Sequence, residues 1–139
     1  MDDTLTASLL QFFDGLPTEA ALGCTITDWL LSTLPAVKVR VQKTQITFRN
    51  RYNFAALSLP RRKQDRQGHA LLLTLGLPRP LDSPRVLLAT EPYPNRWTHH
   101  LRIVQPEALD GELLGWIREA YDFANAKGRG AKNSTCSQP

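Results

Sequence analysis

The sequence lacks the features by which membrane-spanning, secreted and disulfide-rich proteins are usually identified. Over its 139 residues, no apolar run approaches the roughly 20 residues that a transmembrane helix needs. There are two cysteines, Cys24 in a structured segment and Cys136 in a polar tail, so neither a disulfide framework nor a zinc site is indicated. The first ten residues, MDDTLTASLL, are acidic, whereas a secretory signal begins with basic residues. We therefore expect a soluble, cytoplasmic protein that does not bind a membrane.

Motifs of several catalytic and metal-binding classes are also missing. The chain contains no GxSxG, GxxxxGK[ST] or GxGxxG segment, and no HxH, CxxC or HExxH pattern. Cys24 lies in an apolar helical pattern, where cysteine is usually an inert small hydrophobe. We therefore expect a binding protein rather than an enzyme, with no cofactor and no metal ion.

Acidic residues are scarce in the middle of the chain. Residues 38–102 contain thirteen Lys and Arg but only three acids, a net charge of +10, whereas residues 1–37 contain five acids and no base. Such asymmetry indicates contact with an anionic partner. The alternative is a solvated sheet whose edges are blunted by Lys and Arg.

Hydrophobic periodicity predicts one α+β domain over residues 1–126. Helical spacing predicts helices at 5–13, 18–34 and 106–126. Alternation with a period of two predicts an antiparallel sheet of about five strands, at 37–42, 45–50, 51–59, 69–77 and 96–104. We expect the C-terminal helix to pack on this sheet. Residues 78–95, rich in proline, are predicted to form a long irregular connection, and residues 127–139 a disordered tail.

The segment RWTHHLRIV, residues 96–104, places two adjacent histidines on one predicted strand. Because successive side chains of a strand point to opposite faces, His99 shares a face with Trp97 and Leu101 and is expected in the core. His100 shares the other face with Arg102. This parity argues against a metal chelate by the two rings and leaves His100 as an anion contact or proton donor.

The basic residues supply the main candidate site. Lys38 and Arg40 leave a strand on its polar face, and aromatic residues interleave with the bases: Tyr52, Phe54 and Trp97. Such a surface could contact phosphates and stack bases, although aromatic residues of apolar parity are usually core packing. The predicted binding residues are Lys38, Arg40, Lys43, Arg49, Arg51, Tyr52, Arg96, His100 and Arg102.

Three segments in the same order resemble an uncharacterised prokaryotic family, domain of unknown function 5655. They are KTQITFRNRYNFAALSL (43–59), RWTHHLRI (96–103) and LDGELLGWIREAYDFA (109–124). The resemblance covers most of residues 10–124. It implies little about mechanism, because the family's activity is not established. Some relatives carry the domain at the end of a longer chain, which implies an accessory or binding module.

Three hypotheses follow. The first is a binding module whose basic sheet face accepts an anionic partner, with nucleic acid as the leading candidate. The second is a small-molecule or anion pocket, binding or catalytic, between the 78–95 loop and the 96–104 strand. The third is a protein-interaction domain that docks through its amphipathic helices.

Overall fold

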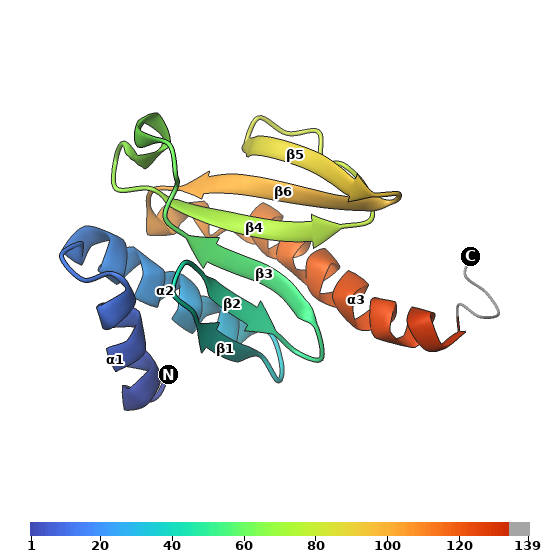
Figure 1. Ribbon diagram of the computed structural model, residues 1–139, viewed down its shortest axis with the longest axis horizontal. Helices are drawn as coiled ribbons and strands as arrows, with labels where there is room; N and C mark the ends of the chain where they lie inside the picture. Colours follow the sequence, from blue (N-terminus) through green and yellow to red (C-terminus); the bar gives the residue numbers. More distant parts are fainter. Residues whose placement is uncertain (134–139) are drawn as a thin grey trace.

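Two helices precede a run of six strands and one long helix follows it in the computed structural model, which describes residues 1–133 (Figure 1). The elements are α1 (Asp3–Phe12), α2 (Pro17–Thr33), β1 (Lys38–Val41), β2 (Ile46–Arg49), β3 (Asn53–Ser58), the 3-10 turn η1 (Lys63–Arg66), β4 (Leu71–Leu77), β5 (Val86–Tyr93), β6 (Arg96–Ile103), the 3-10 turn η2 (Pro106–Ala108) and α3 (Gly111–Asn133). The α+β class and the N-terminal helices, antiparallel sheet and C-terminal helix on the sheet are confirmed.

The described strands form one open sheet in the order β1-β2-β3-β4-β6-β5, and every neighbouring pair is antiparallel. β4 lies inside the sheet between β3 and β6. Its residues alternate between buried and half-buried, as expected for a central strand of an antiparallel sheet that is covered on one face.

The sixth strand corrects the prediction for residues 78–95. Residues 86–93 form β5, which pairs with β6 at the edge of the sheet. Its register with β6 shifts twice, between Val86 and Leu88 and between Thr90 and Tyr93. Such bulges remove the regular alternation by which a strand is recognised, and Pro92 is tolerated because an edge strand leaves one row of backbone groups unpaired.

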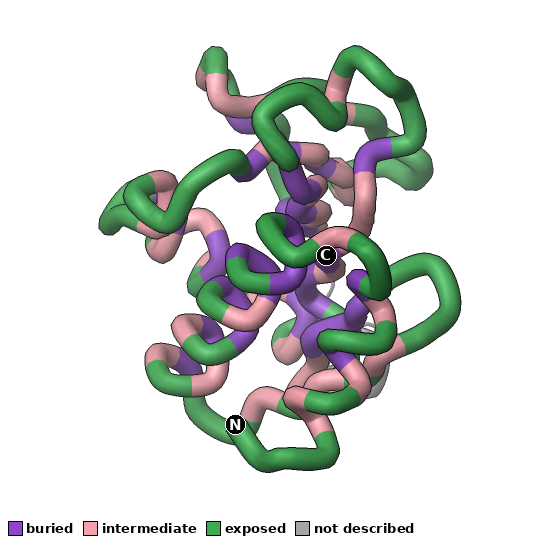
Figure 2. The backbone as a smooth tube through the Cα atoms, turned by 90° about the vertical axis from the view of Figure 1, so that its left-hand side faces the viewer, coloured by how far each residue is buried: buried purple, intermediate pink, exposed green. Residues whose placement is uncertain are grey.

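Helices cover one face of the sheet. α3 lies against β3 and β4, and α2 also contacts β4; in Figure 1 both helices lie behind the sheet. The β4 side chains that point towards the helices are fully buried, namely Leu71, Leu73, Leu75 and Leu77. Figure 2 shows the buried segments gathered along the middle of the molecule, with exposed loops around them. One core therefore lies between the sheet and the helices.

The opposite face of the sheet is only half-buried. Its side chains on β4 are Leu72, Thr74 and Gly76, which alternate with the buried leucines. We call this surface the open face, and it consists of Lys38, Arg40, Thr47, Arg49, Ala56, Ser58, Leu72, Thr74, Gly76, Leu88, Thr90, Thr98, His100 and Arg102. Small side chains occupy its central strands.

The last helix begins and ends later than predicted. Pro106 starts the short turn η2, and α3 begins at Gly111 after Asp110, whose carboxylate accepts a hydrogen bond of 3.0 Å from the N–H of Leu113. α3 continues to Asn133, past the predicted domain end at residue 126, and residues 134–139 of the predicted tail lie outside the described residues. None of the helices within residues 1–133 is long and apolar enough to cross a bilayer.

Candidate functional site

His99 and His100 lie on opposite faces of the sheet, as strand parity predicted. His99 is fully buried on the helix side, where its Nε2 accepts a hydrogen bond of 3.0 Å from the N–H of Leu81. Burial lowers the pKa of His99 below its ordinary value, so the ring is neutral at pH 7. The accepting Nε2 places the proton on Nδ1. His99 therefore holds the segment after β4 against the sheet.

His100 lies on the open face beside the residue that faces it in register. Its Nδ1 is 3.0 Å from Oγ1 of Thr74, on the neighbouring strand β4. Burial lowers the pKa of His100 as well, so this ring is also neutral at pH 7. When the Thr74 hydroxyl donates to Nδ1, the proton lies on Nε2. His100 can then offer an anion a neutral N–H donor rather than a positive charge.

Positive charge gathers on the β1 side of the open face. Lys38 and Arg40 are exposed and alternate with Val39 and Val41, which are half-buried and pack against the core. The basic side chains therefore point away from the helices. The register of β1 and β2 places Lys38 opposite Arg49. Three predicted binding residues are thus neighbours on one surface.

Acidic residues are missing from five of the six described strands. β1, β2, β3, β4 and β6 contain no Asp or Glu. In β5, the carboxylate of Glu91 accepts a hydrogen bond of 3.0 Å from the N–H of Asn95. The helices α1 and α2 show the opposite charge, because they carry acids and no base. No carboxylate of these five strands neutralises the bases of the open face.

Two nitrogens of the Arg102 guanidinium, a predicted anion contact, donate to the protein's own backbone. Its Nε donates a hydrogen bond of 2.8 Å to the backbone oxygen of Asp65, and its guanidinium also donates to the backbone oxygen of Gln67. These bonds attach β6 to the loop that contains η1. Arg102 is on the open face as parity predicted, but its donors hold the protein's own backbone.

Three other predicted binding residues lie in turns. Lys43 is exposed between β1 and β2, and Arg51 and Tyr52 are exposed between β2 and β3. The side chain of Arg49 reaches the second turn, where its guanidinium donates a hydrogen bond of 2.9 Å to the backbone oxygen of Arg51. Lys38, Arg49 and Arg51 therefore form a continuous basic border, whereas Lys43 lies at the other end of β1.

Two of the three aromatic residues considered for base stacking are not on the open face. Phe54 is buried and meets Tyr121 of α3 edge to face, with ring centroids 5.1 Å apart. Trp97 shares the helix-side parity of His99 and is half-buried. For Phe54 the core-packing alternative is correct, whereas Trp97 is not part of the hydrophobic core cluster and Tyr52 is exposed.

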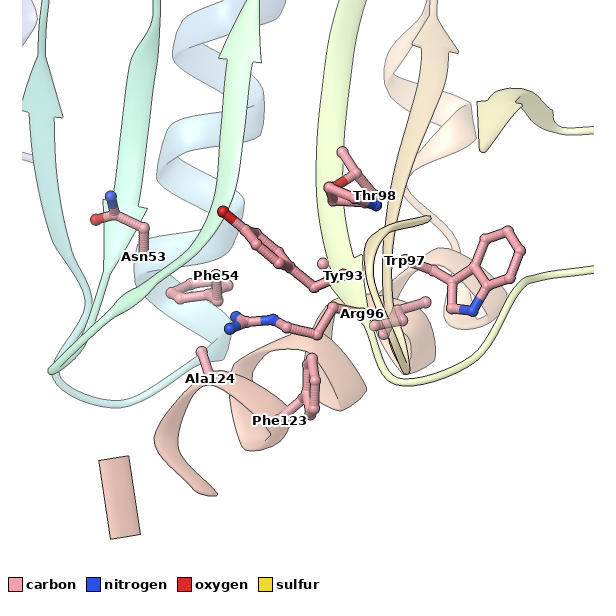
Figure 3. Close-up of a pocket in the computed structure, with 11 residues that line it drawn as sticks. Asn53, Phe54, Tyr93, Arg96, Trp97, Thr98, Phe123 and Ala124 are labelled. Carbon is pink, nitrogen blue, oxygen red and sulfur yellow. The ribbon is translucent and has the colours of Figure 1, made fainter. Parts of the chain in front are cut away.

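A pocket lies at the end of the sheet, where β3 starts and β4 ends (Figure 3). Its volume is about 230 Å³, and its walls come from β3, β4, the β5–β6 hairpin and α3. The lining residues are Asn53, Phe54, Gly76, Leu77, Pro92, Tyr93, Arg96, Trp97, Thr98, Phe123 and Ala124. Of the predicted binding residues, only Arg96 lines this pocket; the other eight lie outside it.

Arg96 contacts an aromatic ring, whereas Arg79 and Arg85 form ion pairs with carboxylates. Its guanidinium lies over the ring of Phe123, with 5.7 Å between the Cζ atom and the ring centroid. Arg79 and Arg85 form ion pairs, with Glu119 and with Asp110 and Glu112 respectively. Within the described part of the chain, no carboxylate forms such a pair with Arg96, so its charge is available to a ligand.

Sequence reasoning missed most of the pocket. Asn53 and Gly76 come from separate strands and Phe123 from α3, and Tyr93 lies in the segment predicted as irregular. No spacing in the sequence relates these positions, because the fold brings them together across long chain distances. Only the hairpin proximity of Tyr93 and Arg96 could have been foreseen, had β5 been recognised.

Among the described residues, no group of three or more His, Cys, Asp or Glu side chains is arranged to hold a metal ion. Comparison with family models identifies the family to which the chain is similar. The model of the family described as Domain of unknown function (DUF5655) matches residues 12–124. No curated protein and no solved structure matches the chain.

Proposed function

The chain belongs to the DUF5655 family, and we propose that it is a cytoplasmic, non-enzymatic module that binds nucleic acid through the open face of its sheet. The observation that carries this proposal is the charge of the sheet. Lys38, Arg40 and Arg49 lie together on the open face, and five of the six described strands contain no acid.

Phosphate groups are the part of a nucleic acid that such a surface would contact. Lysine and arginine neutralise phosphates and release condensed counterions, which supplies sequence-independent affinity. The central strands present Ala56, Ser58, Thr74 and Gly76, whose small side chains let a sugar-phosphate backbone approach the sheet closely. His100 adds a neutral N–H donor on the same row as Thr74 and Ala56.

The surface offers contacts to phosphate but few means of reading bases. Phe54 and Trp97 are on the helix side and cannot form the aromatic platform that many single-strand binders use. We therefore expect weak sequence preference and strong salt dependence.

A titration of the whole protein with fluorescein-labelled oligonucleotides tests this function. Single-stranded DNA, single-stranded RNA and duplex DNA are compared at about 50 and 200 mM salt, where binding by several phosphate contacts weakens by orders of magnitude. Saturable binding that weakens steeply with salt supports the proposal. Absence of binding to every oligonucleotide at the lower salt overturns it.

A further inference from the structure

The pocket exists because β3 and β4 separate before either strand ends. Their pairing stops at Ala55 opposite Leu75, whereas β4 stays paired with β6 as far as Leu77 opposite Trp97. β4 therefore continues past β3 by two residues, Gly76 and Leu77. Both of these residues line the pocket, which we call the fork pocket.

An irregularity in β3 explains the separation. Phe48 faces Ala55, but the next residue of β2, Arg49, faces Asn53, so Phe54 is an extra residue in β3. A bulge of this kind turns consecutive side chains to one face and bends the strand. Phe54 and Ala55 are accordingly both buried, and Phe54 packs against Tyr121 of α3. The start of β3 is thereby drawn towards the helix.

The β5–β6 hairpin directs two polar side chains into the gap between the start of β3 and the end of β4. Tyr93 and Arg96 are partners in the hairpin register, and Figure 3 shows both side chains extending towards Phe54 from the side of β4. The hairpin turn is held by the N–H of Asn95, which donates to the Glu91 carboxylate. This hydrogen bond fixes the backbone of the turn from which the Tyr93 and Arg96 side chains extend.

The floor of the fork pocket is open at Gly76. A Cβ atom added there would meet no other heavy atom within 4 Å. Phe123 forms the wall on which the Arg96 guanidinium rests, and the Tyr93 side chain extends from the hairpin on the β4 side (Figure 3). The pocket therefore combines aromatic walls, the Tyr93 hydroxyl and the Arg96 guanidinium, which forms no ion pair with a carboxylate of the described residues.

We propose that the fork pocket binds a small organic oxyanion, in which a carboxylate or phosphate monoester is attached to an aromatic or other compact apolar body. The planar guanidinium of Arg96 can donate two parallel hydrogen bonds to such an anion. The Tyr93 hydroxyl is a further donor at the pocket, and Phe54 and Phe123 contact the apolar body. The volume of about 230 Å³ is below the roughly 300–1,000 Å³ of pockets for drug-sized ligands, so the ligand is small.

This inference goes beyond the proposed function, since the fork pocket shares only Gly76 and Thr98 with the open face and does not include Lys38, Arg40 or His100. The two sites can therefore be tested separately. Loss of oligonucleotide binding in a Lys38→Gln/Arg40→Gln variant leaves the fork pocket intact, and the failure of either proposal does not entail failure of the other.

Isothermal titration with four probes tests the fork pocket: phenyl phosphate, benzoate, inorganic phosphate and benzamide. We expect saturable binding of phenyl phosphate or benzoate, and binding at least about tenfold weaker for inorganic phosphate and for the neutral benzamide. If inorganic phosphate bound as tightly as the aromatic anions, the aromatic walls would contribute nothing to affinity. If benzamide bound as tightly as they do, the negative charge of the ligand would contribute nothing. Either result overturns the proposal, as does failure of both aromatic anions to bind.

Three variants locate the binding. Arg96→Gln should weaken binding of the aromatic anion about tenfold or more. Gly76→Val should weaken it to a similar extent by occupying the floor, and should not lower the melting temperature because the added side chain meets open space. Arg118→Gln, which removes an exposed arginine of α3, should leave the affinity unchanged. Unchanged affinity in a folded Arg96→Gln or Gly76→Val protein places the ligand elsewhere and contradicts the proposal.

Discussion

The backbone N–H of Leu81 donates a hydrogen bond of 3.0 Å to Nε2 of His99, so a residue of the proline-rich segment is fixed to the buried side of β6. Leu81 also belongs to the core. The bond requires an unprotonated Nε2, because a charged imidazole has two N–H donors and no acceptor. The protonation state of one buried ring is therefore coupled to the position of the segment between β4 and β5.

Stability should fall as the pH is lowered through the range in which an unfolded histidine titrates. Burial lowers the pKa of both His99 and His100 in the folded protein, whereas in the unfolded chain they titrate at about pH 6.5. Below that pH the unfolded chain binds more protons, so their contribution is complete above about pH 7 and declines until the folded pKa values are passed. Urea unfolding at several pH values between 8 and 5 measures this decline.

His99→Gln separates the contribution of His99 from that of the carboxylates. Glutamine keeps a side-chain acceptor for the N–H of Leu81 but does not titrate. The variant should lose less stability than wild type between pH 7 and pH 5. An identical decline in both proteins would contradict a buried, neutral His99. His99→Leu, which leaves the N–H of Leu81 without an acceptor, should cost about 1–3 kcal/mol at pH 7.

Arg102→Gln should loosen the loop around η1 without abolishing the fold. The guanidinium donates to the backbone oxygens of Asp65 and Gln67, and hydrogen bonds from a charged donor are worth about 1.5–3 kcal/mol. The loop carries four trypsin sites, Arg61, Arg62, Lys63 and Arg66. We expect faster tryptic cleavage within residues 61–66 in the variant. Arg118→Gln serves as the control, and equal cleavage rates in the two variants would contradict an anchoring role for Arg102.

Gly23→Ala should destabilise the packing of α1 on α2. A Cβ atom at Gly23 would lie 2.5 Å from Cε2 of Phe13, and overpacking of a core typically costs about 1–3 kcal/mol. Gly115→Ala in α3 is the matched control, because nothing lies within 4 Å of its Cβ position and alanine favours a helix over glycine by about 1 kcal/mol. Melting temperatures should therefore move in opposite directions. A Gly23→Ala protein as stable as wild type would show that the Phe13 ring moves aside at little cost.

Strand parity and helical periodicity are sufficient to predict much of the fold from the sequence. The alternation of RWTHHLRIV assigned His99 to the core and His100 to the other face, and both assignments are confirmed. The same rule correctly placed Lys38 and Arg40 on the outer side of β1. These predictions succeed because the side chains of a regular strand alternate irrespective of what the strand pairs with.

The failures arise where the sheet departs from regular geometry. β5 was missed because two register shifts and Pro92 interrupt its pattern. Phe54 was considered for base stacking, yet the bulge turns it towards Tyr121. The fork pocket contains residues 92–93 and 96–98, from the two segments of the second hypothesis, but its walls from β3, β4 and α3 could not be related to them by local sequence reasoning.

The salt dependence of oligonucleotide binding, compared between wild type, Lys38→Gln/Arg40→Gln and Arg118→Gln, tests the account most directly. If Lys38 and Arg40 each contact a phosphate, the double variant should bind more weakly, and the slope of log affinity against log salt should fall in magnitude by about 1.4 for single strands and about 1.8 for duplex DNA. Arg118→Gln, on the helix side, should keep the wild-type slope and affinity. A double variant with the wild-type slope, or an equal loss in both variants, would contradict binding through the open face.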